Sequence, residues 1–143
     1  MARIVFALLA LLAASSAAAE FRSITENATI FYDAPSTRAA KLFVVSRDLP
    51  VEVITTDATW TKVRDSGGSL AWVERKSLSD KRTLIVTVPV AQVRERAEDQ
   101  APVLFQLQQG VVVDFVENAG AWARVRHADG SAGFLRINQV WGL

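Results

Sequence analysis

The sequence contains no cysteine and a single histidine among its 143 residues, and its acidic and basic side chains nearly balance. Without cysteine there is no disulfide, no thiol nucleophile, no lipid-attachment cysteine and no cysteine-based zinc or iron–sulfur site. The one histidine, His127, lies in the segment 126–130 (RHADG), which is typical of the approach to a tight turn. We therefore expect a surface histidine beside a hairpin, and no metal site.

Sequence motifs of catalytic sites are also missing. There is no glycine-rich phosphate loop, no HExxH zinc motif and no GxSxG nucleophile elbow. Neighbouring carboxylates such as Glu98 and Asp99 occur, but on a polar loop such pairs are usually just solvated. The sequence therefore predicts a protein that is not an enzyme and that uses no cofactor.

The first 19 residues have the pattern of a secretory signal peptide. A short basic start ending at Arg3 is followed by an uninterrupted apolar run over residues 4–14 and by three alanines before Glu20. The apolar stretch is about 16 residues long and is broken by two serines, so it is shorter than the roughly 20 residues of a spanning helix. We expect cleavage after Ala19 and a periplasmic mature chain without a membrane span.

The mature chain carries no net charge. Arg3 is the only charged residue of the leader, so the 16 Lys+Arg of the whole sequence fall to 15 and match the 15 Asp+Glu. Binding to nucleic acid or to an anionic membrane surface needs an excess of basic side chains. The sequence therefore predicts no nucleic-acid partner, and it leaves the oligomeric state open.

An internal repeat is the strongest feature of the sequence. A shift of 62 residues aligns 29–78 with 91–140 without a gap. Such self-similarity predicts two copies of one small domain. The identical positions are nine of fifty, namely Ala39, Leu42, Phe43, Val51, Trp60, Val63, Arg64, Gly68 and Ser69 in the first copy.

Apolar residues within each copy recur at a spacing of two. Val51 and Val53 flank Glu52, for example, which is the alternation of a half-buried strand. Segments rich in Asp, Gly, Ser and Pro separate the strands. Five short strands in about 55 residues are too few for a sandwich, so a small antiparallel barrel is the economical way to leave few exposed edges. We predict an all-β protein with two small five-stranded barrels in tandem.

The expected domain boundaries follow from the repeat. The first domain covers residues 20–80, a linker covers 81–89, and the second domain covers 90–143. The linker, KRTLIVTVP, is β-branched and apolar, unlike the Gly/Ser-rich composition of a flexible linker. We expect it to pack as a strand and to hold the barrels in a fixed relation. A domain of about 60 residues buries only about 60% of its unfolded surface, so contact between the copies is expected to add stability.

Several segments, taken in order, resemble the bacterial Src homology 3 (SH3) family. They are 49–54 (LPVEVI), 60–65 (WTKVRD), 71–73 (AWV) and 76–83 (KSLSDKRT). The Trp-Gly pair at residues 141–142 is similar to the ending of the tandem SH3-like proteins exported by proteobacteria. The resemblance covers nearly all of the mature chain. It implies two partly open five-stranded barrels and a binding rather than catalytic role, often at peptidoglycan or cell-wall peptides.

The sequence departs from the family pattern at three places. A glycine common before the first of these segments is Asp48 in the first copy and Gly110 in the second. The glycine before the aromatic residue of the last strand is Ala71 in the first copy and Gly133 in the second. The NLRxGPG loop of many relatives is replaced in both copies. That loop helps to shape the family's ligand groove, so the groove of this chain must be argued from its own residues.

Two strands place a tryptophan beside two basic side chains. Alternation puts Trp60, Lys62 and Arg64 on one face of their strand, opposite Val63, and the second copy repeats this arrangement. An aromatic ring with basic neighbours can stack on a peptide or sugar and pair with a carboxylate. The candidate ligand-binding residues are Tyr32, Trp60, Lys62, Arg64, Trp122, Arg124 and Arg126.

The tryptophans also have a purely structural interpretation. Trp60 and Trp122 can fold over the barrel end and pack beneath the preceding loop instead of lining a groove. Trp72 and Phe134 are expected in the core, and Trp141 is expected to seal a barrel base.

The predicted function is recognition in the cell envelope. The mature chain is expected to bind peptidoglycan, cell-wall peptides or other peptide segments. The alternative is a protein-interaction or scaffolding subunit for another periplasmic protein, in which two joined domains supply avidity or a rigid spacer. An enzyme that uses carboxylates alone is a third candidate, and the sequence supports it least.

Overall fold

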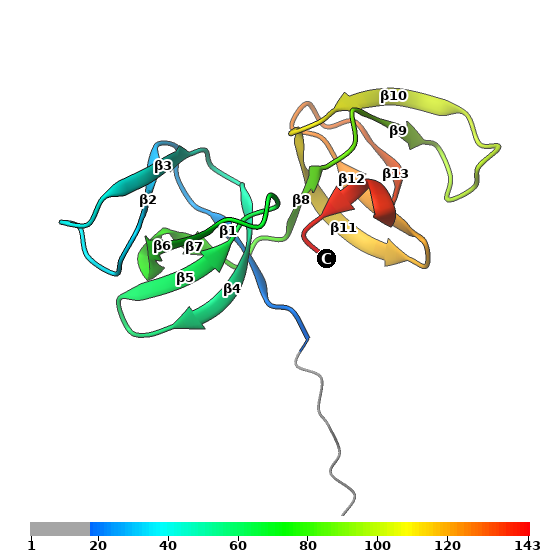
Figure 1. Cartoon of the computed structure of the whole chain (residues 1–143). Helices are drawn as coiled ribbons and strands as arrows, with labels where there is room; N and C mark the ends of the chain where they lie inside the picture. Colours follow the sequence, from blue (N-terminus) through cyan, green and yellow to red (C-terminus); the bar gives the residue numbers. More distant parts are fainter. Residues whose placement is uncertain (1–17) are drawn as a thin grey trace, which may run out of the picture.

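The computed structural model describes residues 18–143, which form two small β-barrels joined in tandem (Figure 1). The expected signal peptide, residues 1–19, lies almost entirely outside the described residues. In the part of the chain from residue 18 onward, no helix is long and apolar enough to cross a membrane.

Each barrel is built from one antiparallel sheet of seven strands, with a 3-10 turn before its last strand. The first contains β1 (Phe21–Ile24), β2 (Thr29–Tyr32), β3 (Lys41–Val45), β4 (Pro50–Thr56), β5 (Trp60–Arg64), β6 (Leu70–Glu74), η1 (Arg75–Ser77) and β7 (Leu78–Ser79). The second contains β8 (Thr83–Val86), β9 (Val90–Arg94), β10 (Val103–Gln108), β11 (Val112–Ala119), β12 (Trp122–Arg126), β13 (Ala132–Arg136), η2 (Ile137–Gln139) and β14 (Val140–Trp141).

The two sheets share one topology. Their strand orders are β3-β2-β6-β5-β4-β1-β7 and β10-β9-β13-β12-β11-β8-β14, so each strand of the second sheet has a counterpart in the first. The prediction of an all-β protein with two tandem barrels is confirmed. Each copy has seven strands instead of the expected five because two further short strands, β1 and β7 in the first copy, pair with each other beside β4.

The segment expected to be a linker contains the first strand of the second barrel. β8 pairs with β11 and β14, both of the second sheet, and it is the counterpart of β1. The repeat therefore extends back beyond residue 29 to Phe21. Only residues 80–82 separate the two sheets, and the second domain begins before residue 90.

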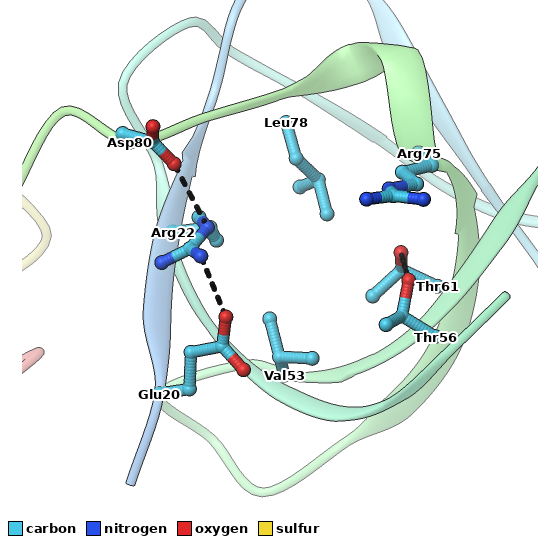
Figure 2. A pocket seen from close by; sticks show the side chains of 8 residues that line it. All are labelled: Glu20, Arg22, Val53, Thr56, Thr61, Arg75, Leu78 and Asp80. Atoms are coloured by element: carbon cyan, nitrogen blue, oxygen red, sulfur yellow. Dashed lines mark hydrogen bonds and ion pairs between the residues drawn. The ribbon is translucent and has the colours of Figure 1, made fainter. Parts of the chain in front are cut away.

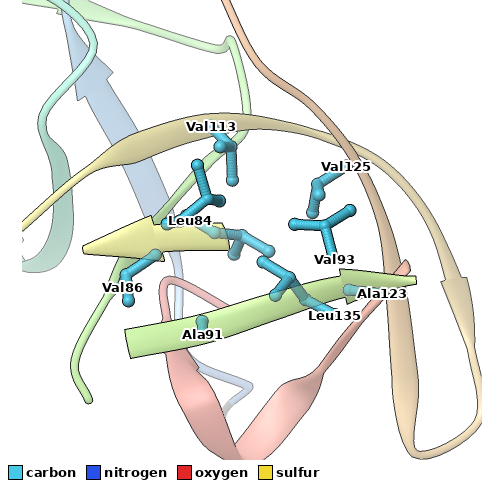
Figure 3. Packing of buried hydrophobic residues seen from close by; sticks show 9 residues of the cluster. Leu84, Val86, Ala91, Val93, Val113, Ala123, Val125 and Leu135 are labelled. Carbon is cyan, nitrogen blue, oxygen red and sulfur yellow. The ribbon is translucent and has the colours of Figure 1, made fainter. Parts of the chain in front are cut away.

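Each barrel has its own hydrophobic core, made by alternate residues of its strands. The core of the first consists of Ile24, Phe31, Val51, Val63, Ala71 and Val73. The core of the second, shown in Figure 3, consists of Leu84, Val86, Ala91, Val93, Leu107, Val113, Ala123, Val125 and Leu135. The sheets therefore position their outward side chains on two separately packed scaffolds.

An aromatic and cationic contact joins the barrels. The guanidinium of Arg82 lies between the rings of Phe21 in the first barrel and Phe115 in the second, 5.6 and 5.7 Å from their centroids. Arg82 Nη2 also donates a hydrogen bond to the carbonyl of Gly142 at 2.7 Å. The ring of Trp141 meets that of Phe21 edge to face at 5.1 Å. Trp141, expected to seal a barrel base, thus lies at the junction, because β14 runs beside β8.

Polar groups strengthen the same junction. Thr83 Oγ1 donates a hydrogen bond to the carbonyl of Asp48 at 2.6 Å, and Ser23 Oγ donates to the carbonyl of Lys81 at 2.8 Å. Lys81 Nζ lies 3.3 Å from a carboxylate oxygen of Asp48 and 3.2 Å from one of Asp114. Burial by itself lowers the pKa of Lys81, but Asp114 and Asp48 outweigh it and raise that pKa above its ordinary value. One ammonium group therefore links carboxylates of both barrels.

Removal of the Arg82 guanidinium is expected to weaken the coupling between the barrels. Arg82→Met keeps an unbranched apolar stem but loses both ring contacts and the hydrogen bond to Gly142. Within residues 18–143, Arg82 Nε is buried without a hydrogen-bond partner, which offsets part of the stabilisation that the guanidinium provides. We expect the free energy of unfolding to fall by about 1–2 kcal/mol, and the calorimetric unfolding transition to separate into two. Arg38→Met, at an exposed loop position of the first barrel, is the control. One unchanged transition in Arg82→Met would contradict the coupling.

Candidate functional site

The strand β5 presents three of the predicted site residues on its outer face. Trp60, Lys62 and Arg64 are half-buried, whereas Thr61 and Val63 between them are buried inside the barrel. This alternation matches the face assignment made from the sequence. Arg64 Nη1 lies 3.2 Å from a carboxylate oxygen of Glu52 on β4, so its charge is paired within the sheet.

The pairing of β2 and β5 with β6 brings Tyr32 against Trp60. Tyr32 ends β2 and Trp60 begins β5, two strands that are separated by β6 in the sheet. Their rings meet edge to face, with centroids 5.6 Å apart and planes at 87°. Tyr32 is 7% exposed, so the side chain exposed at this point is mainly that of Trp60.

The turn before Trp60 is held by a carboxylate. Asp57 Oδ1 accepts hydrogen bonds from the amides of Trp60 and Thr59, each at 2.8 Å. These two bonds hold the pKa of Asp57 below its ordinary value, with the Trp60 amide the larger cause. The carboxylate therefore stays ionised at neutral pH and fixes the start of β5.

Trp72 belongs to the same outer face, although the sequence placed it in the core. Ala71 and Val73 are the buried residues of β6, and Trp72 between them is half-buried on the outside. Lys62 is the cross-strand partner of Trp72, and its Nζ lies 6.0 Å from the ring centroid. The core prediction was wrong because alternation allows only one parity on β6, and Val73 occupies the inside. The set Tyr32, Trp60, Lys62 and Trp72 is termed the aromatic face below.

The second barrel covers its corresponding tryptophan. Trp122 is 8% exposed, and the guanidinium of Arg136 lies over its ring, 4.6 Å from the centroid. Arg136 Nε in turn donates to a carboxylate oxygen of Asp99 at 3.0 Å, and the two residues form an ion pair. Arg94 stands at the position in this barrel that is equivalent to Tyr32. Trp122 is thus packed beneath the ion pair of Arg136 and Asp99, in line with the interpretation that this tryptophan folds over the barrel end instead of lining a groove.

The two basic predicted residues of β12 lie on the outside of the second barrel. Arg124 Nη1 is 3.5 Å from a carboxylate oxygen of Glu117. Arg126 is exposed and forms no ion pair with any residue from 18 to 143. The core prediction for Phe134 was wrong in the same way as for Trp72, because Gly133 and Leu135 are the buried residues of β13.

Comparison with known protein families identifies the family of this chain. The family model of the bacterial SH3 domain matches the sequence twice, over residues 26–80 and 87–142. The chain belongs to the bacterial SH3 domain family. Its two SH3 domains coincide with the two barrels described above, apart from the first strand of each.

Solved structures similar to this tandem of SH3 domains include three NlpC-type proteins. NlpC1 from Trichomonas vaginalis is 15% identical, with a TM-score of 0.40, over 95% of this chain and 50% of its own length. NlpC2 from the same organism is 15% identical, with a TM-score of 0.39, over 89% and 49%. An NlpC/P60 family protein from Bacillus cereus is 14% identical, with a TM-score of 0.39, over 85% and 56%. The chain spans about half the length of these proteins. No curated protein matches the sequence.

The two SH3 domains therefore differ in what they present. The first brings together Tyr32, Trp60 and Lys62 of the predicted set and adds Trp72. The second buries Trp122 and presents Phe134, half-buried on the outer face, as the cross-strand partner of Arg124. A signal for this difference lies in the repeat itself, since Arg136 replaces a glutamate and Asp99 a threonine of the first copy.

Proposed function

We propose that the chain is a non-catalytic binding module of the cell envelope that recognises cell-wall peptides through the aromatic face of its first SH3 domain. Bacterial SH3 domains are typically binding modules for cell-wall components or proteins, and the family membership is the basis of the general role. The proposed location is the periplasm, which rests on the signal-like residues 1–19 of the sequence.

The observation that carries the choice of site is the grouping of rings around one cation. Trp60 and Trp72 are half-buried, so each offers ring surface to a ligand while its other side packs on the barrel. Lys62 forms no ion pair with residues 18–143, so its ammonium group is available to a peptide carboxylate. Large aromatic residues at such positions commonly dominate binding energy. The second domain offers no comparable tryptophan, because Trp122 lies under Arg136 and the smaller Phe134 stands at the position of Trp72.

Cosedimentation with purified peptidoglycan sacculi tests this proposal. We expect the wild-type chain to bind and Trp60→Ala to bind about tenfold more weakly, which corresponds to about 1.4 kcal/mol. Trp122→Ala, the matched change in the second domain, is expected to leave binding nearly unchanged if the protein remains folded. Circular dichroism of each variant establishes folding. Absence of binding by the wild-type chain, or equal binding by Trp60→Ala, contradicts the proposal.

A protein-interaction role is the second candidate, and the edge strand β3 favours it. β3 is the first strand of its sheet order, with β2 as its only neighbour in that order. Leu42, Phe43 and Val44 follow one another along it, and all three are exposed, Val44 to 69%. An exposed apolar edge can pair with an extended segment of another protein. Crosslinking in cells from a photoreactive residue at position 44 that yields only muropeptides, or nothing, would argue against this role.

A further inference from the structure

The first barrel has a polar cavity at one end, on the side of β5 opposite to the aromatic face. Its volume is about 180 Å³, and Figure 2 shows the side chains that line it. Thr61, the buried neighbour of Trp60 and Lys62, is one of them, so the cavity and the aromatic face lie on opposite sides of the same strand.

One side of the cavity carries two carboxylates. Arg22 lies between them, with Nη2 2.6 Å from a carboxylate oxygen of Glu20 and Nε 3.1 Å from one of Asp80. Nη1 of Arg22 donates to the carbonyl of Phe21 at 3.1 Å. Each carboxylate has a second oxygen that can accept a hydrogen bond from a ligand. Both carboxylates are at least half exposed, so they are accessible to a ligand from solvent.

The opposite side carries a positive charge and two hydroxyl groups. In Figure 2 the guanidinium of Arg75 points into the cavity from the side opposite to Arg22, beside Thr56 and Thr61. Its one hydrogen bond, from Nη1 to the carbonyl of Asp57, is long at 3.4 Å, and Arg75 forms no ion pair with residues 18–143. The hydroxyls of Thr56 and Thr61 lie 2.8 Å apart and share one hydrogen bond. Val53 and Leu78 form apolar walls between the two charged sides.

The second barrel indicates that the fold does not require this cavity. At the positions of Arg22 and Thr61, 62 residues later, it has Leu84 and Ala123, both fully buried in its core. Phe115 replaces Val53 there and packs against the same core. Arg75 is replaced by Ile137. The second barrel thus has buried apolar side chains where the first has Arg22 and Thr61, and close apolar packing is the usual arrangement of a barrel interior.

We propose that this cavity binds a small zwitterion, an amino acid or a short peptide with both ends free. Its carboxylate is held by Arg75 and by one hydroxyl proton of the Thr56–Thr61 pair, and its ammonium group by Glu20 and Asp80. The Thr56 hydroxyl gives up for this a long bond of 3.3 Å to the carbonyl of Asp57. A guanidinium and hydroxyl donors are the groups that recognise a carboxylate. A cavity of about 150 Å³ holds a benzene molecule, so the volume here suits a ligand of amino-acid size.

An NMR titration of the ¹⁵N-labelled protein tests the proposal with four probes. Alanine and alanyl-alanine carry both charges, N-acetylalanine only the carboxylate and alaninamide only the ammonium group. We expect saturable shifts of the amides of Thr61, Arg75 and Leu78 with at least one of the first two probes. Which of them binds more tightly distinguishes an amino acid from a peptide. The singly charged probes are expected to bind about tenfold more weakly.

Variants separate this site from the aromatic face. Arg75→Met and Thr61→Val, the latter nearly isosteric, are each expected to weaken binding of the zwitterionic probe about tenfold. Arg64→Met, on the outer face of β5, is the control and is expected to bind that probe like the wild type. Arg75→Met is also expected to bind sacculi like the wild type, so failure of one proposal is distinguishable from failure of the other. The proposal is overturned if neither zwitterion shifts the cavity amides, if N-acetylalanine or alaninamide binds as tightly as the zwitterions, or if Arg75→Met leaves binding unchanged.

Discussion

Replacement of Phe31 by alanine is expected to lower the free energy of unfolding of the first barrel by about 3–5 kcal/mol. Phe31 is 1% exposed and is the largest side chain in a core of only six buried residues. Its removal leaves a void that so small a core cannot close. Because a small domain is stable by only about 5–15 kcal/mol, a loss of this size is a large part of the stability of this barrel. Denaturant unfolding monitored by the indole NMR signals of Trp60 and Trp72 measures the loss.

A matched control lies on the neighbouring strand. Phe43 is the cross-strand partner of Phe31 on β3, but it is 44% exposed. Phe43→Ala is expected to cost about 1 kcal/mol or less, because nearly half of that residue is already exposed to water. Equal losses in Phe31→Ala and Phe43→Ala would contradict the assignment of the core. The signals of Trp122 and Trp141 report at the same time whether the second barrel loses stability with the first, as the junction at Arg82 predicts.

A methyl group at residue 133 is expected to destabilise the second barrel. A Cβ at Gly133 would lie 2.6 Å from Cγ1 of Val93 and 2.7 Å from the carbonyl oxygen of Arg94, both on β9. The carbonyl oxygen belongs to the backbone of the facing strand and cannot rotate away, so β9 and β13 must move apart. We expect Gly133→Ala to cost about 3 kcal/mol, at the upper end of the usual range for overpacking. Hydrogen exchange of the β9 and β13 amides is expected to accelerate, whereas the first barrel remains protected.

The first barrel supplies the reciprocal experiment. Ala71 stands at the position equivalent to Gly133, so that barrel accommodates the methyl group that the second excludes. Ala71→Gly is expected to cost about 1 kcal/mol, from the added freedom of glycine in the unfolded chain and the loss of a buried methyl. A neutral Gly133→Ala would contradict the close approach of β9 and β13.

The strands and their division into two domains were largely predictable from the sequence, because both depend on local sequence patterns. The repeat and the alternation of Val51, Glu52 and Val53 were sufficient to predict two all-β barrels. The second domain was predicted to begin at residue 90, although its first strand, β8, begins at Thr83. β1 and β8 each precede the aligned part of their copy and share no identical residue, so only their strand pairing reveals that they correspond. The outer position of Trp72 also followed from alternation, but the size of its side chain favoured a core assignment.

The candidate sites were predictable in part. The common face of Trp60 and Lys62 follows from alternation along one strand, and the sequence identified it. The covering of Trp122 by Arg136 was not predicted, because it depends on the register of β12 against β13, which alternation along a single strand does not give. The cavity between Arg22 and Arg75 was missed for the same reason, and because Arg22 precedes the aligned repeat.

The sequence alone determined the all-β class, the duplication, the faces of each strand and the near balance of charge. These properties depend on residues that are close in the chain, where the two-residue period of a strand leaves little freedom. Only the tertiary structure decided which copy exposes its tryptophan, which copy keeps a polar cavity, and that Arg82, Phe21 and Trp141 join the barrels. Such contacts form between different strands, some neighbouring and some far apart in the chain, and they depend on strand register and on the packing of side chains across the sheet.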